Sequence, residues 1–136
     1  RFGDPETQPI MMRLKSDLVE LCLAALAGNL DSTRADWDPR PALGVVLAAG
    51  GYPESYAKGD VIDGLDSPAP ANSKIFHAGT QMDKGKVVTN GGRVLCATAL
   101  GADIAEAQKT AYQLVDNIHW DKVYFRTDIG HKALNR

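Results

Sequence analysis

The spacing of apolar residues predicts two helices, one near each end of the chain. The first follows Ser16-Asp17, a suitable helix cap, and stops at Gly28-Asn29. The second begins at Asp103-Ile104-Ala105-Glu106, a capping pattern, and runs to about Ile118. The face of this second helix that we expect in the core consists of Ala107, Ala111, Leu114, Val115 and Ile118.

Between these helices, continuous apolar runs predict strands. The stretches 42–49 (ALGVVLAA) and 94–99 (VLCATA) are typical of strands that are buried on both faces. Shorter strands are expected at 61–62, 74–80, 87–88 and 123–125, and a hairpin turn is expected at 81–86. Short antiparallel strands with few helices indicate the α+β class.

The chain is organised around residues 87–101, VVTNGGRVLCATALG, which predict a strand, a break and a second strand. Asn90-Gly91-Gly92 favours a turn or bulge because these residues reach positive φ at little cost. Arg93 places a charge at this break, and a guanidinium is rarely buried without an anionic partner. Arg93 is therefore expected either to point into a cleft or to pair with a carboxylate of the protein.

Composition narrows the class of protein. The chain has 136 residues, of which 44% are hydrophobic, so it can bury the core of one ordinary domain. Its net charge of −2 gives no basic field for nucleic acid, and no apolar run approaches the ~20 residues of a membrane span. No signal peptide is visible. Cys22 and Cys96 both lie in apolar runs, which predicts buried, reduced thiols and a cytoplasmic location.

Two loops rich in glycine and proline are candidates for ligand binding. The first nine residues, RFGDPETQP, are dense in charge, and their start at Arg1 without Met suggests a part of a longer protein. Gly50-Gly51-Tyr52-Pro53 directly follows a predicted strand and is either an ordinary turn or a loop with amides open to a ligand. Arg126 and Asp128 are interpreted as a structural pair. His77 has no partner at metal-ligand spacing.

Four stretches, in this order, resemble the C-terminal part of the glycinamide ribonucleotide synthetase (phosphoribosylamine–glycine ligase) family of the ATP-grasp superfamily. They are RFGDPETQP, ALGVVLAAGGYP, KVVTNGGRVLCATALG and VYFRTDIG. The resemblance implies an ATP-dependent ligase of de novo purine biosynthesis that joins glycine to 5-phosphoribosylamine. The products would be glycinamide ribonucleotide, ADP and phosphate. Glycine's carboxylate would first be phosphorylated, and the amine would then displace the phosphate.

The resemblance also implies a fold and its domains. Residues 42–136 would form a small antiparallel barrel-sandwich domain with flanking helices. Residues 1–30, a loop plus a helix, would be the tail of an ATP-grasp domain, and residues 31–41 a connector. The partners would be small-molecule substrates and the N-terminal part of the same enzyme, which we expect to be a monomer without nucleic-acid or membrane partners.

Site residues follow from the resemblance as well. Arg1 resembles the arginine that faces the transferred phosphoryl group, and Asp4 and Glu6 would face the substrate amines, so these three are the catalytic candidates. Arg93 and the loop Gly50, Gly51, Tyr52 and Pro53 would bind substrate. ATP with Mg²⁺ or Mn²⁺ is implied for the full-length enzyme. The metal ligands would lie upstream, so no metal or cofactor is expected on this chain.

Because the glycine-rich ATP lid and the metal ligands are not in this sequence, the chain alone is expected to be inactive. One alternative is a non-catalytic binding or lid module derived from an ATP-grasp C domain. Another is a related ATP-grasp carboxylase or formyl-transfer enzyme, against which RFGDPETQ together with TNGGRVL argues. An upstream region ending in Glu-x-Asn-x-Arg would distinguish the ligase from the module.

Overall fold

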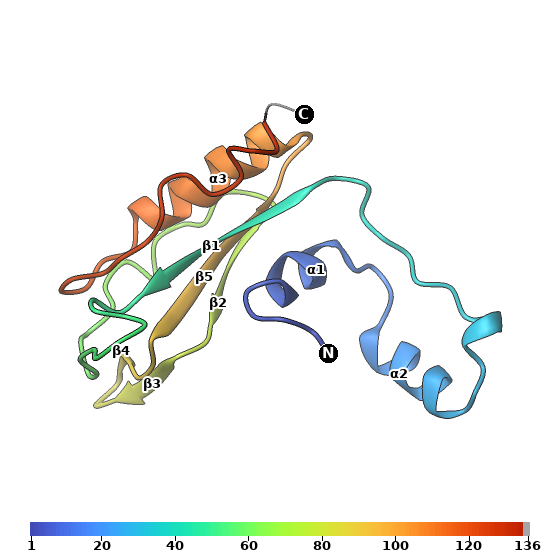
Figure 1. The fold of residues 1–136 in the computed structure, drawn as a ribbon, viewed down its shortest axis with the longest axis horizontal. Coiled ribbons are helices and arrows are strands. Elements are labelled where there is room, and N and C mark those ends of the chain that lie inside the picture. The colour runs from blue at the N-terminus through green and yellow to red at the C-terminus, as the bar shows by residue number, and fades with distance from the viewer. Residues whose placement is uncertain (135–136) are drawn as a thin grey trace.

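The computed structural model describes residues 1–134 and has α+β architecture (Figure 1). The elements, in chain order, are α1 (Thr7–Arg13), α2 (Leu18–Leu26), the 3-10 helix η1 (Leu30–Ser32), β1 (Ala42–Ala48), β2 (Ser73–His77), β3 (Thr80–Asp83), β4 (Lys86–Thr89), β5 (Arg93–Leu100) and α3 (Ile104–Asp116). The α+β class and the two long helices are confirmed. No helix within residues 1–134 is long and apolar enough to cross a membrane.

Both predicted helix starts have the expected caps. The carboxylate of Asp17 accepts a hydrogen bond from Val19 N at 2.7 Å at the start of α2. At the start of α3, the carboxylate of Asp103 accepts one from Glu106 N at 2.8 Å. Each cap satisfies a backbone donor that the first helical turn cannot use, which fixes where the helix begins.

The main sheet is antiparallel and has the strand order β1-β5-β2 (Figure 1). The central strand, β5, pairs on both sides: Ala97 lies opposite Val45 of β1 and Ile75 of β2. The second sheet is the hairpin of β3 and β4, whose turn contains Lys84 and Gly85 at positive φ. The predicted hairpin is therefore confirmed, but its turn is shorter than 81–86, because residues 81–83 belong to β3 and the strand predicted at 74–80 ends at His77.

The two faces of the main sheet carry different helices. One face packs on α3 and forms the core, with Leu43, Val45, Leu47, Leu95, Ala97 and Ala99 against Ala107, Ala111, Leu114 and Val115. The predicted core face of α3 is thus confirmed. On the other face lies α1, which contacts β1 and β5; there, a Cβ on Gly44 would lie 3.0 Å from Cys96 Sγ and 3.3 Å from Pro9. The N-terminal loop is consequently held on the face opposite α3.

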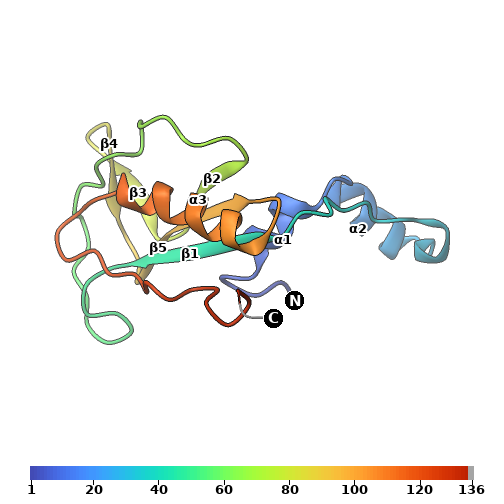
Figure 2. The same cartoon turned by 90° about the horizontal axis from the view of Figure 1, so that it is seen from above.

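Residues 15–37, here called the arm, extend away from the sheet and carry α2 and η1 (Figure 2). The arm is fastened at its base, where Leu14 bridges Trp37 and Lys15 N donates to Asp36 O at 2.9 Å. No residue of α2 is buried. The prediction that Cys22 is buried is therefore wrong: within residues 1–134 the main contact of α2 is with the 3-10 helix η1, which leaves Cys22 exposed.

Two further expectations need correction. Within residues 1–134 the strands do not close into a barrel, and β4 and β5 belong to different sheets. The break predicted at Asn90-Gly91-Gly92 is confirmed, and there the backbone pairs with Gly79: Asn90 N donates to Gly79 O at 2.7 Å, and Gly79 N donates to Arg93 O at 2.9 Å. The strands predicted at 61–62 and 123–125 reduce to single bridges, Val61 with Val88 and Tyr124 with Ala48.

Candidate functional site

Three stretches that are far apart in sequence meet at one end of the main sheet. Asp4 comes from the N-terminal loop, Tyr52 from the loop after β1, and Arg93 is the first residue of β5. Arg93 Nε lies 3.1 Å from Asp4 Oδ2, and Arg93 Cζ lies 5.9 Å from the centroid of the Tyr52 ring. Arg93 therefore pairs with a carboxylate, as one interpretation expected. That carboxylate belongs to Asp4, a candidate site residue, so the pair also lies at the candidate site, as the other interpretation expected.

The glycines of the loop after β1 allow its tight path. Gly51 has φ +93°, and a Cβ there would overlap Ser55 O, while a Cβ on Gly50 would lie 2.5 Å from Lys122 Cβ. Two amides of this turn are used inside the protein, because Tyr52 N donates to Ala49 O at 3.1 Å and Glu54 N donates to Gly51 O at 3.0 Å. The loop therefore contributes to the site through the ring of Tyr52, next to Pro53, rather than through those amides.

Gly92 and Tyr56 support that ring. A Cβ on Gly92 would overlap Tyr52 and lie 3.1 Å from Tyr56 Cε1. The rings of Tyr52 and Tyr56 are 6.0 Å apart at a tilted angle of 59°. Sequence reasoning treated Gly92 as a turn residue and did not single out Tyr56. The sequence did offer one signal for Gly92 as a site residue, because this glycine directly precedes Arg93, the charged residue of the break.

A hollow of about 270 Å³ lies beside this constellation. It is bounded by two arginines, Arg93 and Arg126, and otherwise by Pro5, Gly44, Val46, Ala48, Tyr52, Tyr124, Phe125 and Ile129. Its walls are therefore mainly apolar and aromatic, and they come from the N-terminal loop, β1 and the C-terminal segment. We call this space the Arg93 hollow.

The second arginine of the hollow is already paired. Arg126 Nε and Nη2 donate to the two oxygens of Asp128 at 2.8 and 2.7 Å, which confirms the predicted pair and lowers the pKa of Asp128. Tyr112 holds the segment, since its hydroxyl donates to Arg126 O at 2.7 Å and accepts from Ile129 N at 3.1 Å. Arg126 is thus a wall of the hollow with its guanidinium turned to Asp128.

The remaining catalytic candidates lie nearby without joining the ion pair. Arg1 is exposed and donates to its neighbour Phe2 O at 3.5 Å. Glu6 is the residue before α1, and its carboxylate folds over Gly3, where a Cβ would overlap it. Within residues 1–134, neither Arg1 nor Glu6 forms an ion pair with another side chain. The structure thus assembles Asp4, Tyr52 and Arg93 and leaves Arg1 and Glu6 at the edge of the site.

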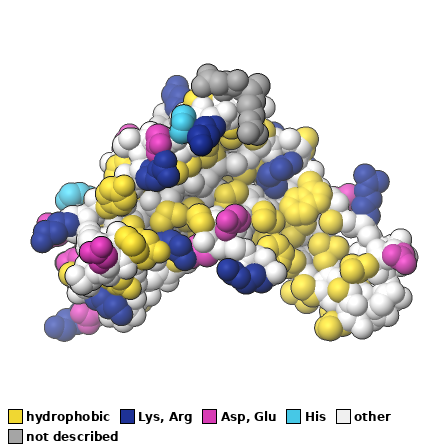
Figure 3. Space-filling view, in the orientation of Figure 1, with side chains coloured by type: hydrophobic (Ala, Val, Ile, Leu, Met, Phe, Trp, Pro, Cys, Tyr) yellow, Lys and Arg dark blue, Asp and Glu magenta, His cyan; other side chains and the backbone are white. Residues whose placement is uncertain are grey.

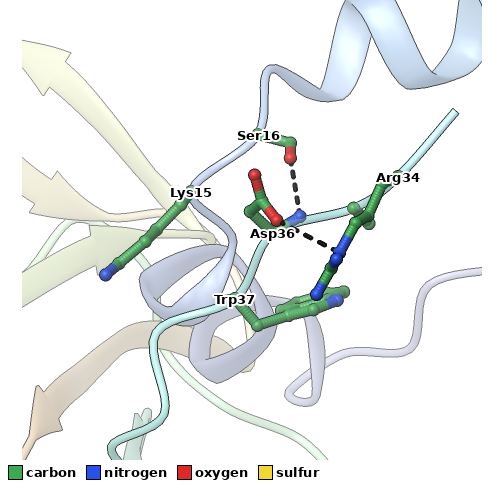
Figure 4. Close-up of a pocket in the computed structure, with 6 residues that line it drawn as sticks. Lys15, Ser16, Arg34, Asp36 and Trp37 are labelled. Carbon is green, nitrogen blue, oxygen red and sulfur yellow. Dashed lines mark hydrogen bonds and ion pairs between the residues drawn. The ribbon is translucent and has the colours of Figure 1, made fainter.

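A second, open hollow of about 540 Å³ lies at the base of the arm (Figure 4). Asp36 N donates to Ser16 Oγ at 2.8 Å, and Arg34 Nε lies 3.6 Å from Asp36 Oδ1. Figure 4 shows Arg34 extending beside the ring of Trp37, while Lys15 points away. The side chains of Arg34 and Asp36 are 91% and 69% exposed, so this hollow has the character of a solvated loop junction.

Among the described residues, no three His, Cys, Asp or Glu side chains come together in an arrangement that could hold a metal ion. His77 lies on β2 with Nδ1 at 3.1 Å from Thr80 Oγ1. The residues described therefore do not fit a divalent cation.

Comparison with known proteins identifies the family. Residues 42–132 match the family described as "Phosphoribosylglycinamide synthetase, C domain". The phosphoribosylamine–glycine ligases of Vibrio cholerae and Pseudomonas putida are 65% and 61% identical over 136 residues, which is 100% of this chain and 32% of each relative. The ligase structure from Thermotoga maritima superposes with a TM-score of 0.72 at 36% identity, covering 95% of this chain and 31% of that one. The chain thus spans about a third of the length of the curated relatives it matches, and it belongs to the phosphoribosylglycinamide synthetase family, whose C domain it contains.

Proposed function

We propose that this chain is the C-terminal part of a phosphoribosylamine–glycine ligase of purine biosynthesis. The observation that carries the proposal is the 65% identity to a protein of that name across all 136 residues, site loops included. In the proposed reaction, ATP phosphorylates the carboxylate of glycine. The amine of 5-phosphoribosylamine then attacks the acyl carbon, so that a C–N bond forms, the C–O bond to phosphate breaks and the amine loses a proton.

Arg93 supplies charge for this reaction. Its planar guanidinium is suited to a carboxylate or a phosphate, and phosphoryl transfer depends mainly on positioning and charge neutralisation. Arg1 would face the transferred phosphoryl group, and Asp4 and Glu6 the substrate amines. The apolar walls of the Arg93 hollow would keep water from a reactive acyl phosphate.

ATP and Mg²⁺ or Mn²⁺ would be held by the rest of the enzyme, since the residues described here do not fit a divalent cation. Bound there, they would supply the phosphoryl group and neutralise its charge. We propose a monomeric, cytoplasmic enzyme whose partners are its small-molecule substrates, with no nucleic-acid partner.

For the domains, we propose that residues 1–30 are the tail of an ATP-grasp domain, 31–41 a connector and 42–136 the C domain. The arm supports this division, because it lies outside the matched range and exposes large apolar side chains (Figure 3). They are Val19, Leu23, Leu26, Leu30 and Trp37, which are 46–86% exposed. Contiguous apolar patches of this kind mark contact surfaces, and the N-terminal part of the ligase would cover this one.

A chimera tests the function. This chain would replace the matching C-terminal stretch of the Vibrio cholerae ligase, to which it is 65% identical. With ATP, magnesium, glycine and 5-phosphoribosylamine, we expect the chimera to release ADP and the isolated chain to match a protein-free control. A folded but inactive chimera would instead favour the non-catalytic module, and ADP release by the chain alone would contradict the domain assignment.

A pair of substitutions tests the arm in the same chimera. Leu26→Ala should change the unfolding free energy of the isolated chain by less than about 0.5 kcal/mol, because Leu26 is 86% exposed. In the chimera it should lower Tm. Leu47→Ala is the control and should cost about 2–5 kcal/mol in both proteins, because Leu47 is fully buried. An unchanged Tm of the chimera with Leu26→Ala would overturn the assignment of the arm.

A further inference from the structure

Two Arg–Asp pairs of this chain are closed, which means that both carboxylate oxygens accept a hydrogen bond from the guanidinium. Arg40 Nε and Nη2 reach the two oxygens of Asp38 at 2.9 and 2.8 Å. Arg126 and Asp128 form the same bidentate pair at 2.8 and 2.7 Å. In both, carboxylate and guanidinium lie fork to fork, so the two carboxylate oxygens and the Nε–Nη2 edge of the guanidinium are used by the pair.

The pair between Arg93 and Asp4 is open by comparison. It rests on one contact, from Nε to Oδ2 at 3.1 Å, and the other oxygen of Asp4 accepts a long hydrogen bond, at 3.4 Å, from Gln8 Nε2. Within residues 1–134, the terminal nitrogens Nη1 and Nη2 of Arg93 have no hydrogen-bond partner. Both side chains are nearly half exposed, at 42% and 45%. Arg93 therefore keeps its two-pronged edge available.

The surroundings of that edge suit a ligand. Arg93 lines the Arg93 hollow together with Pro5 and Tyr52, so a bound group has space beside this residue. Tyr52 lies under the guanidinium at 5.9 Å and supports its plane. The apolar walls strengthen the attraction between Arg93 and an anion, because they exclude water from one side.

We infer that Asp4 is the internal counter-ion of Arg93, and that an oxyanion, either carboxylate or phosphate, binds Arg93 in competition with it. A half-exposed ion pair is weak, so an anion can replace it at little cost. The antagonism is reciprocal: the anion weakens the hold of Arg93 on Asp4, and Asp4 weakens the binding of the anion. The arriving anion thus releases a carboxylate in the same loop as Glu6. The inference rests on the proposed function in one respect, namely which substrate carries the anion.

The test is an NMR titration of this chain that follows the Nε–Hε resonance of Arg93 at constant ionic strength. Inorganic phosphate and acetate are the two probes and distinguish the two kinds of oxyanion. Asp4→Asn removes the counter-ion, so we expect at least one probe to bind this variant about two- to fivefold more tightly than the unsubstituted chain. Asp36→Asn is the charge-matched control in the arm and should leave the affinity unchanged.

Arg93→Gln completes the cycle. In that background, the affinity for the probe should fall and the effect of Asp4→Asn on that affinity should vanish, followed on the backbone resonances of residues 3–8. An Asp4→Asn variant that binds both probes no more tightly than the unsubstituted chain would overturn the inference, as would an effect of Asp4→Asn that persists without Arg93. The titration requires no ligase activity, so an inactive chimera would refute the proposed function while leaving this result intact.

Discussion

The ring of Tyr52 lies against Gly92 so closely that any side chain at position 92 would overlap it. This contact allows the ring to reach under the guanidinium of Arg93. Gly92→Ala should therefore displace the ring and destabilise the chain by about 1–3 kcal/mol through overpacking. The Arg93 Nε–Hε resonance, which senses the aromatic ring, should move toward its unfolded position.

A double substitution separates the contact from a general effect on the backbone. If Tyr52 is what Gly92→Ala disturbs, Tyr52→Ala should relieve it, and the two losses of stability should be less than additive. Strictly additive losses would show that Gly92 acts on something other than this ring.

In the ligase chimera, Arg93→Lys should lower kcat/KM by about tenfold to a hundredfold. Lysine keeps the charge and loses the fork, a charge-assisted contact is worth about 1.5–3 kcal/mol, and each ~1.4 kcal/mol is a factor of ten. The melting temperature should hardly change, because the ion pair with Asp4 is half exposed. Arg34→Lys, in an exposed pair of the arm, is the control. Full activity of Arg93→Lys would remove Arg93 from the site.

The ionisation of Asp38 should make the unfolding free energy of the chain depend on pH in the acid range. The hydrogen-bonded guanidinium of Arg40 holds the pKa of Asp38 well below its usual range. A depressed pKa in the folded state means that the stabilisation is present above the unfolded pKa, at about pH 4, and is lost as pH falls below it. Asp38→Asn should thus unfold at lower urea than the unsubstituted chain near neutral pH, and the gap should narrow toward about pH 2. A gap that is constant with pH would contradict the ion pair's role.

The two cysteines should react at very different rates. Burial raises the pKa of the Cys96 thiol, which is 2% exposed, while the hydroxyl of Thr98 at 3.4 Å partly opposes this and the charge of Asp4 adds to it. Cys22 is exposed on the arm. A thiol reagent should therefore modify one cysteine quickly in the folded chain and both in urea. The Cys22→Ala variant identifies the slow thiol, and equal rates in the folded state would contradict the structure.

Helix starts and buried strands were predictable because their determinants are local. Asp17 and Asp103 cap the helices that their position in sequence predicts, and the apolar run after Arg93 is the central strand. Periodicity shows that α2 has an apolar face but cannot show what covers that face, which is why Cys22 was placed in the core. The turn at Asn90-Gly91-Gly92 was likewise visible, but its pairing with Gly79 depends on the tertiary fold.

The candidate site was predictable as a set of residues but not as an arrangement. The resemblance named Asp4, Tyr52 and Arg93, and the residue types favoured an anion partner for Arg93. Their meeting depends on α1 lying on the face of the sheet opposite α3, which no local pattern specifies. Gly92 and Tyr56 were missed as site residues for the same reason, since their role lies in contacts with Tyr52 across the fold.

The main sheet, with β5 at its centre, and the arm can unfold independently of each other. The amides of β5 lie between two partner strands, and its side chains from Val94 to Leu100 are buried. These amides should therefore exchange with deuterium only when the whole sheet unfolds. The arm is fastened at its base and can fray in a smaller event. Because Asp4 sits beside α1 on the sheet and Arg93 begins β5, melting of the arm leaves the ion pair in place. The arm can therefore open and close while the sheet keeps the site assembled.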